Sequence, residues 1–96
     1  MTSPRITFYS GSQLDNPACG GPTPSRNSMI AAVKKGGAFA CGDHIRISHK
    51  NKHIKVKVVD YCESCSDRAV DLTPGAFAKL ASLDTGIITG ARMSLD

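Results

Sequence analysis

The fold of this chain is decided by VKVVDYCESC at residues 56–65 and AVDLTPGAF at residues 69–77. The first segment opens with alternating apolar and basic side chains, which is typical of a β-strand with one buried and one solvated face. In the second segment Thr73 and Pro74 form a helix-start signal, because threonine caps a helix and proline suits its first position. The carboxylates Asp60, at the end of the strand, and Asp71, just before the helix, flank a Cys-x-x-Cys pair.

Length and cysteine content predict a small domain held by covalent links. The 96 residues are 41% hydrophobic and include no Trp, and we expect one domain over residues 1–96 with a flexible start at residues 1–4. A chain of this length buries only about 60–65% of its unfolded surface, so its core is marginal. Its 4 cysteines can form two disulfides, each contributing about 2–4 kcal/mol, which indicates an oxidising, extracellular setting and a secreted protein.

Charge and hydropathy argue against membrane and nucleic-acid partners. No segment approaches the run of about 20 apolar residues that a membrane span requires. The net charge is +4, and a basic stripe follows the predicted hairpin, but no aromatic side chains are interleaved with it to stack bases. We interpret the stripe as a solvated strand face with at most a weak preference for acidic surfaces. Its members are Arg46, Lys50, Lys52, Lys55 and Lys57.

A β-hairpin over residues 44–58 is the clearest local element, because apolar and polar residues alternate on both sides of a turn near Asn51. With the turn centred on Asn51, the numbers of opposed residues add up to about 102, which places Cys41 almost opposite Tyr61 and Cys62. This register predicts the disulfides Cys41–Cys62 and Cys19–Cys65.

Three further strands and a short helix complete the predicted fold. The strands span residues 5–9, 29–33 and 86–95, and residues 10–26 form a long ordered loop rich in Gly, Pro, Asn and Ser. The helix follows Thr73 and presents one apolar face. Many short strands with one short helix predict a small closed barrel of the mainly β class.

The cysteines and three histidines could also form a metal site or a redox-active pair. A zinc site at the Cys-x-x-Cys pair would need Cys19 and Cys41 as further ligands, and a redox pair would need a βαβ context that is missing here. Two structural disulfides suit a small secreted barrel better. Histidines on a hairpin are expected to lie exposed among lysines, so we predict no metal and no cofactor. These histidines are His44, His49 and His53.

Six short motifs, taken in order, resemble those of a known group of small barrels. The motifs are TFY (7–9), ACG (18–20), IAAV (30–33), CGD (41–43), VVDYCESC (58–65) and VDLTPGAF (70–77). Over nearly the whole chain they resemble the double-psi β-barrels of the rare lipoprotein A, expansin, barwin, kiwellin and loosenin group. The resemblance implies a six-stranded double-psi β-barrel with one or two short helices and two disulfides. It specifies function less well, because one fold can carry unrelated sites.

The resemblance implies an acidic site but argues against catalysis. Asp71 matches the general acid of the hydrolytic members, and Asp60 matches the aspartate that ends the preceding strand. The lytic transglycosylases of the group carry a His where this chain has Val33, and the endoglucanases carry a second Asp after the first strand's aromatic residue, where this chain has Ser10. Because glycoside hydrolysis needs a paired acid and base, we expect no catalytic residues and no enzyme.

Both aspartates also have structural interpretations. Asp60 shares the parity of the apolar positions of its strand, so it should point toward the barrel interior and accept backbone N–H groups that pin a loop. A catalytic role is the alternative. Asp71 either helps Thr73 to cap the helix or faces the groove as a functional carboxylate, and the two roles are compatible.

Three functions compete for this sequence: glycan cleavage, polysaccharide binding and protein binding. The paired catalytic residues are missing, and the few aromatic residues make a thin platform for sugars, so we expect a secreted, monomeric, non-catalytic barrel that binds a protein. The resemblance to secreted inhibitors makes a papain-like cysteine protease the favoured target. The alternative is an expansin- or loosenin-like protein that binds or loosens cell-wall polysaccharide without hydrolysis. Candidate binding residues are Tyr9, Ser10, Gly20, Gly21, Phe39, Asp60 and Asp71.

Overall fold

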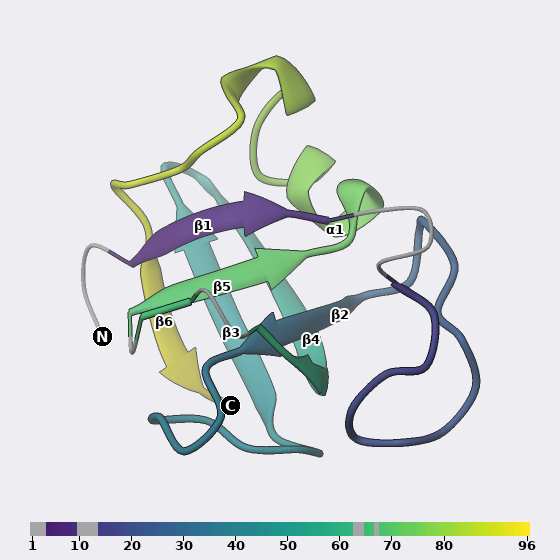
Figure 1. Cartoon of the computed structure of the whole chain (residues 1–96). Coiled ribbons are helices and arrows are strands. Elements are labelled where there is room, and N and C mark those ends of the chain that lie inside the picture. The colour runs from purple at the N-terminus through teal and green to yellow at the C-terminus, as the bar shows by residue number, and fades with distance from the viewer. Residues whose placement is uncertain (1–3, 10–13, 63–64, 67) are drawn as a thin grey trace.

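Six strands form one curled sheet in the computed structural model, which describes residues 4–9, 14–62, 65–66 and 68–96 (Figure 1). The strands lie in the order β1-β5-β2-β4-β3-β6. β1 pairs in parallel with β5 and β2 with β4, and the remaining neighbours are antiparallel. The strand bounds are β1 Arg5–Phe8, β2 Ile30–Val33, β3 His44–His49, β4 Lys52–Tyr61, β5 Ala69–Leu72 and β6 Arg92–Leu95. The mainly β prediction is confirmed.

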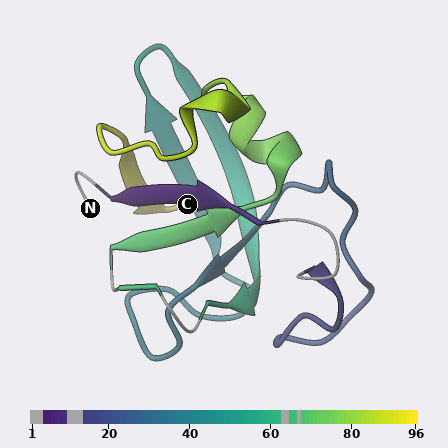
Figure 2. The ribbon, with the colours of Figure 1, turned by 45° about the horizontal axis from the view of Figure 1, so that its top comes forward.

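The two edges of the sheet meet through a short bridge. Ile6 in β1 exchanges two backbone hydrogen bonds of 2.9 Å with Ile88, which lies shortly before the opposite edge strand, β6. Two orientations show the strands wrapping around a common interior (Figures 1 and 2). Apolar side chains from the strands and the helix fill that interior. The most buried include Ile6, Ala31, Ile45, Ile47, Val56, Val58, Val70, Leu72, Phe77 and Met93.

The β3–β4 hairpin forms where the alternation predicts it. Ile45 faces Val56, so the register differs by one residue from the predicted one. The difference arises in the turn, where Lys50 adopts a left-handed φ of 55° and the strands are joined by two residues rather than by a loop centred on Asn51.

A β-bulge in β4 reverses the predicted direction of Asp60. On β2, Ala31 faces Val58, but the next residue, Ala32, faces Asp60, so Val59 is an extra residue in β4. Consecutive residues of β2 point to opposite faces of the sheet, so Asp60 lies on the face opposite the core residue Val58. The interior position predicted from parity is therefore wrong, because the parity count assumed a strand without a bulge.

The helix α1 (Pro74–Ala78) begins as predicted. The Thr73 hydroxyl accepts a hydrogen bond from the Ala76 N–H at 3.2 Å and donates one to the Ser28 carbonyl at 2.5 Å. A Cβ on Gly75 would lie 2.6 Å from the Asn27 side chain, so the helix start packs closely against the preceding loop. Thr73 therefore joins the helix to the segment before β2.

Two boundaries differ from the predictions. The last strand is limited to β6, and a 3-10 turn η2 (Leu83–Thr85) lies between α1 and the bridge at Ile88. The sequence does not predict β5, because its two buried residues, Val70 and Leu72, are too few to establish an alternation. Among the described residues, no helix is both long and apolar enough to span a membrane.

The disulfides are Cys19–Cys41 and Cys62–Cys65, so the predicted pairing is wrong. The prediction extended the hairpin register through Cys41, but Gly42 adopts a φ of 87°, and the chain turns away from β4 at that point. The Cys41 side chain therefore meets the long loop that carries Cys19 instead of the end of β4.

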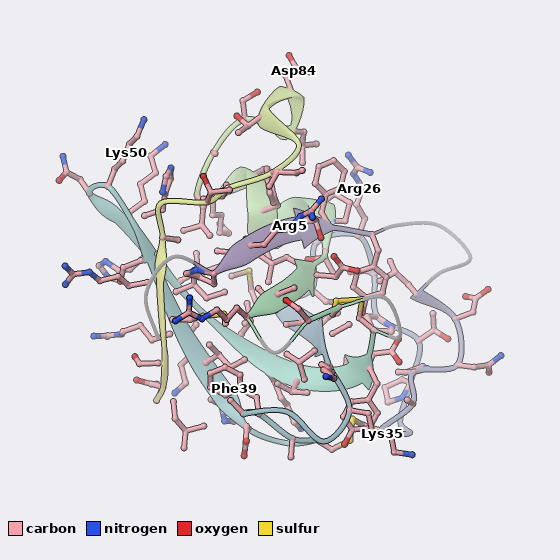
Figure 3. The ribbon with its side chains drawn as sticks, turned by 60° about the vertical axis from the view of Figure 1, so that its left-hand side comes forward. Arg5, Arg26, Lys35, Phe39, Lys50 and Asp84 are labelled. Carbon is pink, nitrogen blue, oxygen red and sulfur yellow. A yellow bond between two sulfur atoms is a disulfide. The ribbon has the colours of Figure 1, made fainter. Side chains whose placement is uncertain are left out.

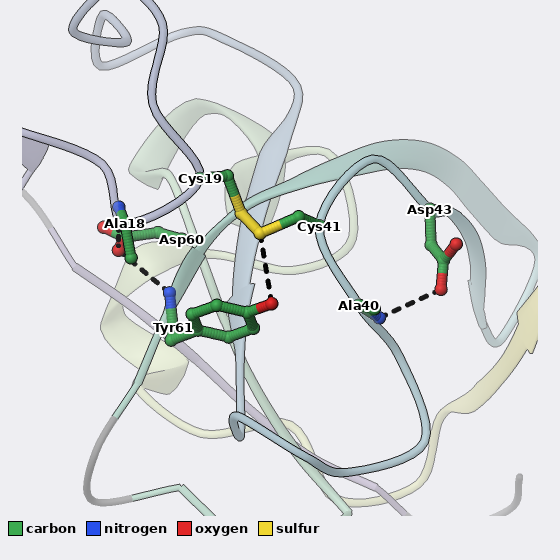
Figure 4. The surroundings of a disulfide bond; sticks show 7 residues. All are labelled: Ala18, Cys19, Ala40, Cys41, Asp43, Asp60 and Tyr61. Atoms are coloured by element: carbon green, nitrogen blue, oxygen red, sulfur yellow. Dashed lines mark hydrogen bonds between the residues drawn. A yellow bond between two sulfur atoms is a disulfide. The ribbon is translucent and has the colours of Figure 1, made fainter.

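Backbone contacts hold Cys19 beside the end of β4. Its N–H donates to the Val59 carbonyl at 3.0 Å, so the bulged residue anchors the loop. The Tyr61 hydroxyl lies 3.1 Å from Cys41 Sγ and donates to it, because a disulfide sulfur carries no proton (Figure 4). Cys41 thus does lie near Tyr61, as the hairpin register predicts, although its partner is Cys19.

Candidate functional site

Four strands align one row of side chains on the outer face of the sheet. Ala32 in β2 faces Asp60 of β4 on one side and Asp71 of β5 on the other. Asp71 in turn faces Thr7 of β1. Neighbouring strands lie about 4.8 Å apart, so the backbones of the two aspartates are roughly 10 Å apart. The bulge at Val59 creates this row, because it brings Asp60 to the outer face.

A pocket of about 520 Å³ opens over the β1–β5 part of the row. Alternation along β1 sends Ile6 into the core and leaves Arg5 and Thr7 facing the pocket. Asp71 is the one carboxylic acid among the described residues of the lining. The lining consists of Arg5, Thr7, Phe8, Tyr9, Cys62, Cys65, Ser66, Ala69 and Asp71.

The carboxylate of Asp71 makes one hydrogen bond and one contact with a disulfide sulfur. The Thr7 hydroxyl donates to Oδ1, and Cys62 Sγ lies 3.3 Å from Oδ2. Burial disfavours the charged form and raises the pKa of Asp71, while the nearby Arg5 guanidinium offsets part of this effect. Asp71 thus presents a carboxyl group to the pocket, and the contacts of its oxygens are with Thr7 and Cys62.

Tyr9 lies at the base of this site instead of forming an exposed contact. Its side chain is only 8% exposed and packs with Leu14 and Ala32. Burial, and then the charges of Asp60 and Asp71, raise the pKa of the Tyr9 hydroxyl. Within the described part of the chain this buried hydroxyl has no hydrogen-bond partner, which is uncommon for a buried polar group.

Asp60 serves as a backbone acceptor. Its Oδ1 accepts from the Ala18 N–H at 2.9 Å and from the Tyr61 N–H at 2.8 Å (Figure 4). These bonds agree with the prediction that Asp60 pins a loop, although it does so from the outer face. A second hollow of about 500 Å³ lies here, lined by Ala18, Lys34, Lys35, Asp60, Tyr61 and Cys62.

The remaining candidate residues are scattered. Gly20 and Gly21 are exposed, with φ of 83° and 87°, in the loop that Cys19–Cys41 ties to residues 34–43. Phe39 is only 8% exposed and belongs to the core, so its ring is not offered to a partner. Ser10 lies outside the described residues.

A possible metal-binding cluster lies in this pocket: the Sγ atoms of Cys62 and Cys65 and a carboxylate oxygen of Asp71 are all within 4.8 Å of one another. The two sulfurs form a disulfide, and zinc is bound by thiolates rather than by disulfide sulfur. The cluster therefore does not fit a metal, and its effect is to cover one oxygen of Asp71.

Sequence reasoning missed Arg5 and Thr7 as site residues. The alternating pattern of residues 5–9 predicts that Arg5 and Thr7 lie on the polar face of a strand. It does not predict which strand lies beside them. The parallel pairing of β1 with β5 places Thr7 opposite Asp71, and parallel partners are distant in sequence.

Comparison with known proteins identifies relatives along nearly the whole chain. Residues 18–91 match the protein family described as lytic transglycolase, which has the double-psi β-barrel fold. The papain inhibitor of Streptomyces mobaraensis is 30% identical over 95 residues, which make up 90% of this chain and 65% of that protein. This chain thus spans 65% of the length of that curated relative.

Solved structures show the same fold. The Streptomyces papain inhibitor superimposes with a TM-score of 0.81 at 30% identity, covering 99% of this chain and 92% of the other. The Clavibacter michiganensis expansin without ligand superimposes with a TM-score of 0.80 at 31% identity, covering 100% of this chain and 50% of the expansin. A variant of that expansin in complex with cellohexaose gives a TM-score of 0.80 at 29% identity, covering 99% and 50%.

Proposed function

Because this chain belongs to the lytic transglycolase family of double-psi β-barrels, we propose that it is a secreted, non-catalytic member that inhibits a papain-like cysteine protease by binding. The observation that carries the proposal is the similarity to the Streptomyces papain inhibitor, which extends over 99% of this chain in three dimensions. Two disulfides in a chain of this size support an extracellular setting.

The contents of the pocket support a binding role over glycan cleavage. Hydrolysis needs an acid and a base on opposite sides of the scissile bond. Asp71 alone supplies a carboxyl group among the described lining residues. Asp60 lines the other hollow, and its Oδ1 accepts hydrogen bonds from the backbone N–H groups of Ala18 and Tyr61. Val33 stands where the transglycosylases carry histidine, and its side chain is buried in the core.

Two loops tied together supply a rigid binding surface. Cys19–Cys41 links the loop before β2 to residues 34–43, and Asp60 holds the first loop through the Ala18 N–H. Such bracing lowers the conformational entropy that is lost on binding. Gly20 and Gly21 carry no side chains, so the surface of a partner can approach their backbone.

Under this proposal the two loops cover the protease cleft and exclude substrate without a covalent bond. The hollow between them, about 500 Å³ in volume and flanked by Lys34 and Lys35, is available to a protease side chain. Its position beside Ala18 defines where a substitution should block binding.

Inhibition of papain by matched tryptophan variants tests this surface. Ala18→Trp fills the hollow, whereas Ala78→Trp adds the same bulk at an exposed position on α1. We expect Ala18→Trp to weaken inhibition at least tenfold and Ala78→Trp to leave it unchanged. Equal inhibition by both variants, or no inhibition by the parent protein, contradicts the proposal.

A second candidate function is polysaccharide binding without hydrolysis. It is favoured by the similarity to an expansin crystallised with cellohexaose and by the position of Tyr9 and Asp71 in one pocket. Pull-down on cellulose, chitin or peptidoglycan that is lost in Asp71→Ala supports this function, whereas papain inhibition that survives Asp71→Ala supports the first. Release of soluble sugars from any of these polymers establishes an enzyme instead.

A further inference from the structure

The basic stripe of the hairpin becomes a two-dimensional array in the fold. β3, β4, β6 and the residue after β6 place nine outward positions in three cross-strand rows, and all nine except the partly buried Ser48 are exposed. With about 4.8 Å between strands and about 6.8 Å between alternate residues, the array covers roughly 10 by 14 Å. We call it the basic face; its rows are Lys57–His44–Asp96, Lys55–Arg46–Ser94 and His53–Ser48–Arg92.

The net positive charge of the protein is concentrated at this face. The face contains four Lys or Arg residues and one carboxylate, Asp96. The whole chain has 12 basic and 8 acidic residues. Four basic residues against one acidic residue here leave eight against seven elsewhere, so the remainder is nearly neutral.

Like charges oppose each other inside the array. Arg46 faces Lys55 directly, an arrangement that destabilises a sheet relative to a neutral pair. Asp96 approaches both, with Oδ2 3.1 Å from Lys55 Nζ and Oδ1 3.9 Å from Arg46 Nε. The hydrogen bond and charge of Lys55, with the charges of Arg46 and His44, lower the pKa of Asp96. One carboxylate thus offsets only part of the positive potential.

The positive side chains project into solvent. The side chains of Arg46 and Lys55 are 59% and 58% exposed. Figure 3 shows nitrogen-tipped side chains extending from the hairpin, with Lys50 at its tip and Arg5 in the middle of the view. The basic face shares no residue with the pocket of Asp71 or with the hollow beside Ala18.

We propose that the basic face binds an acidic polysaccharide, a linear sugar polymer with an anionic group on each repeat. The array is exposed on the outer side of the sheet, so an extended chain can lie along it, and its regularly spaced cations complement repeated anions. Ser48 and Ser94 offer hydroxyl groups to the sugar. None of the nine positions carries Phe, Tyr or Trp, the side chains that typically stack on nucleic-acid bases. The site would tether the protein to an acidic matrix and leave its loops available.

Binding to polygalacturonate measured at several salt concentrations tests this site. The variant Arg46→Gln/Lys55→Gln/Lys57→Gln removes three charges from the face. The control Arg26→Gln/Arg68→Gln/Lys79→Gln removes three charges at exposed positions elsewhere, so the net charge is matched. Thermal melts establish that both variants are folded, and neutral dextran reports binding that is independent of charge.

We expect the face variant to bind at least tenfold more weakly at about 50 mM salt, and the slope of log K against log salt to become shallower by about 2 units. The control should keep most of the affinity, and both variants should still inhibit papain. Equal weakening of both variants would show that net charge alone is responsible and would overturn the proposal. So would failure of the parent protein to bind polygalacturonate, or tighter face-dependent binding to the oligonucleotide poly(dT), which would assign the face to nucleic acid.

Discussion

Removing the Cys19–Cys41 disulfide should destabilise the protein more than removing Cys62–Cys65. A disulfide restricts the unfolded chain, and the restriction grows with the length of the closed loop. The sequence separations are 22 and 3 residues. The chain-entropy relation therefore gives about 3.4 kcal/mol for the first link and about 2 kcal/mol for the second.

The double variants Cys19→Ala/Cys41→Ala and Cys62→Ala/Cys65→Ala make the comparison direct. For a domain of this size, the expected decreases in Tm are roughly 15–25 °C and roughly 8–16 °C, respectively. Urea unfolding followed by circular dichroism measures the free energies. A loss in the second variant that equals or exceeds the loss in the first would refute the argument from loop length.

Tryptic mapping without reduction tests the pairing itself. Cleavage after Lys57 and Arg68 should release residues 58–68 as one peptide with an internal disulfide, while the peptides of Cys19 and Cys41 remain joined. The pairing predicted from the hairpin register would instead join all three peptides. Mass spectrometry distinguishes the two results without any assumption about energy.

Three further substitutions probe the site and its support. The raised pKa of Asp71 means that its stabilising contribution is complete below the unfolded pKa and is lost as pH rises through the folded value. Asp71→Asn should therefore raise Tm at pH 7, with no gain below about pH 4; a gain that persists in acid would contradict this cause. Asp60→Ala leaves two backbone N–H groups without their acceptor and should cost about 1–3 kcal/mol in urea unfolding, whereas Asp60→Asn, which keeps one oxygen, should cost less. Gly75→Ala places a Cβ 2.6 Å from Asn27 and should cost about 1–3 kcal/mol, while Gly90→Ala, with open space around it, should change the melting curve little.

Local patterns in the sequence predicted the elements whose energetics are local. The alternation on both sides of Asn51 predicted the hairpin, and Thr73 with Pro74 predicted the start of α1. The predictions failed where the chain departs from regular geometry. The bulge at Val59 redirected Asp60, and the left-handed Gly42 redirected Cys41. A valine gives no sign of a bulge, and a glycine permits a left-handed conformation without requiring one.

The sequence by itself determined the family, the β character, the helix cap and the presence of Asp71 beside a strand end, because each depends on residues that are neighbours along the chain. Only the tertiary structure decided which cysteines pair, which strand lies beside Asp71, and how the hairpin cations join Arg92 on β6. These outcomes depend on strand order and register between distant segments. Packing sets both, and a single strand's alternation is compatible with many neighbours.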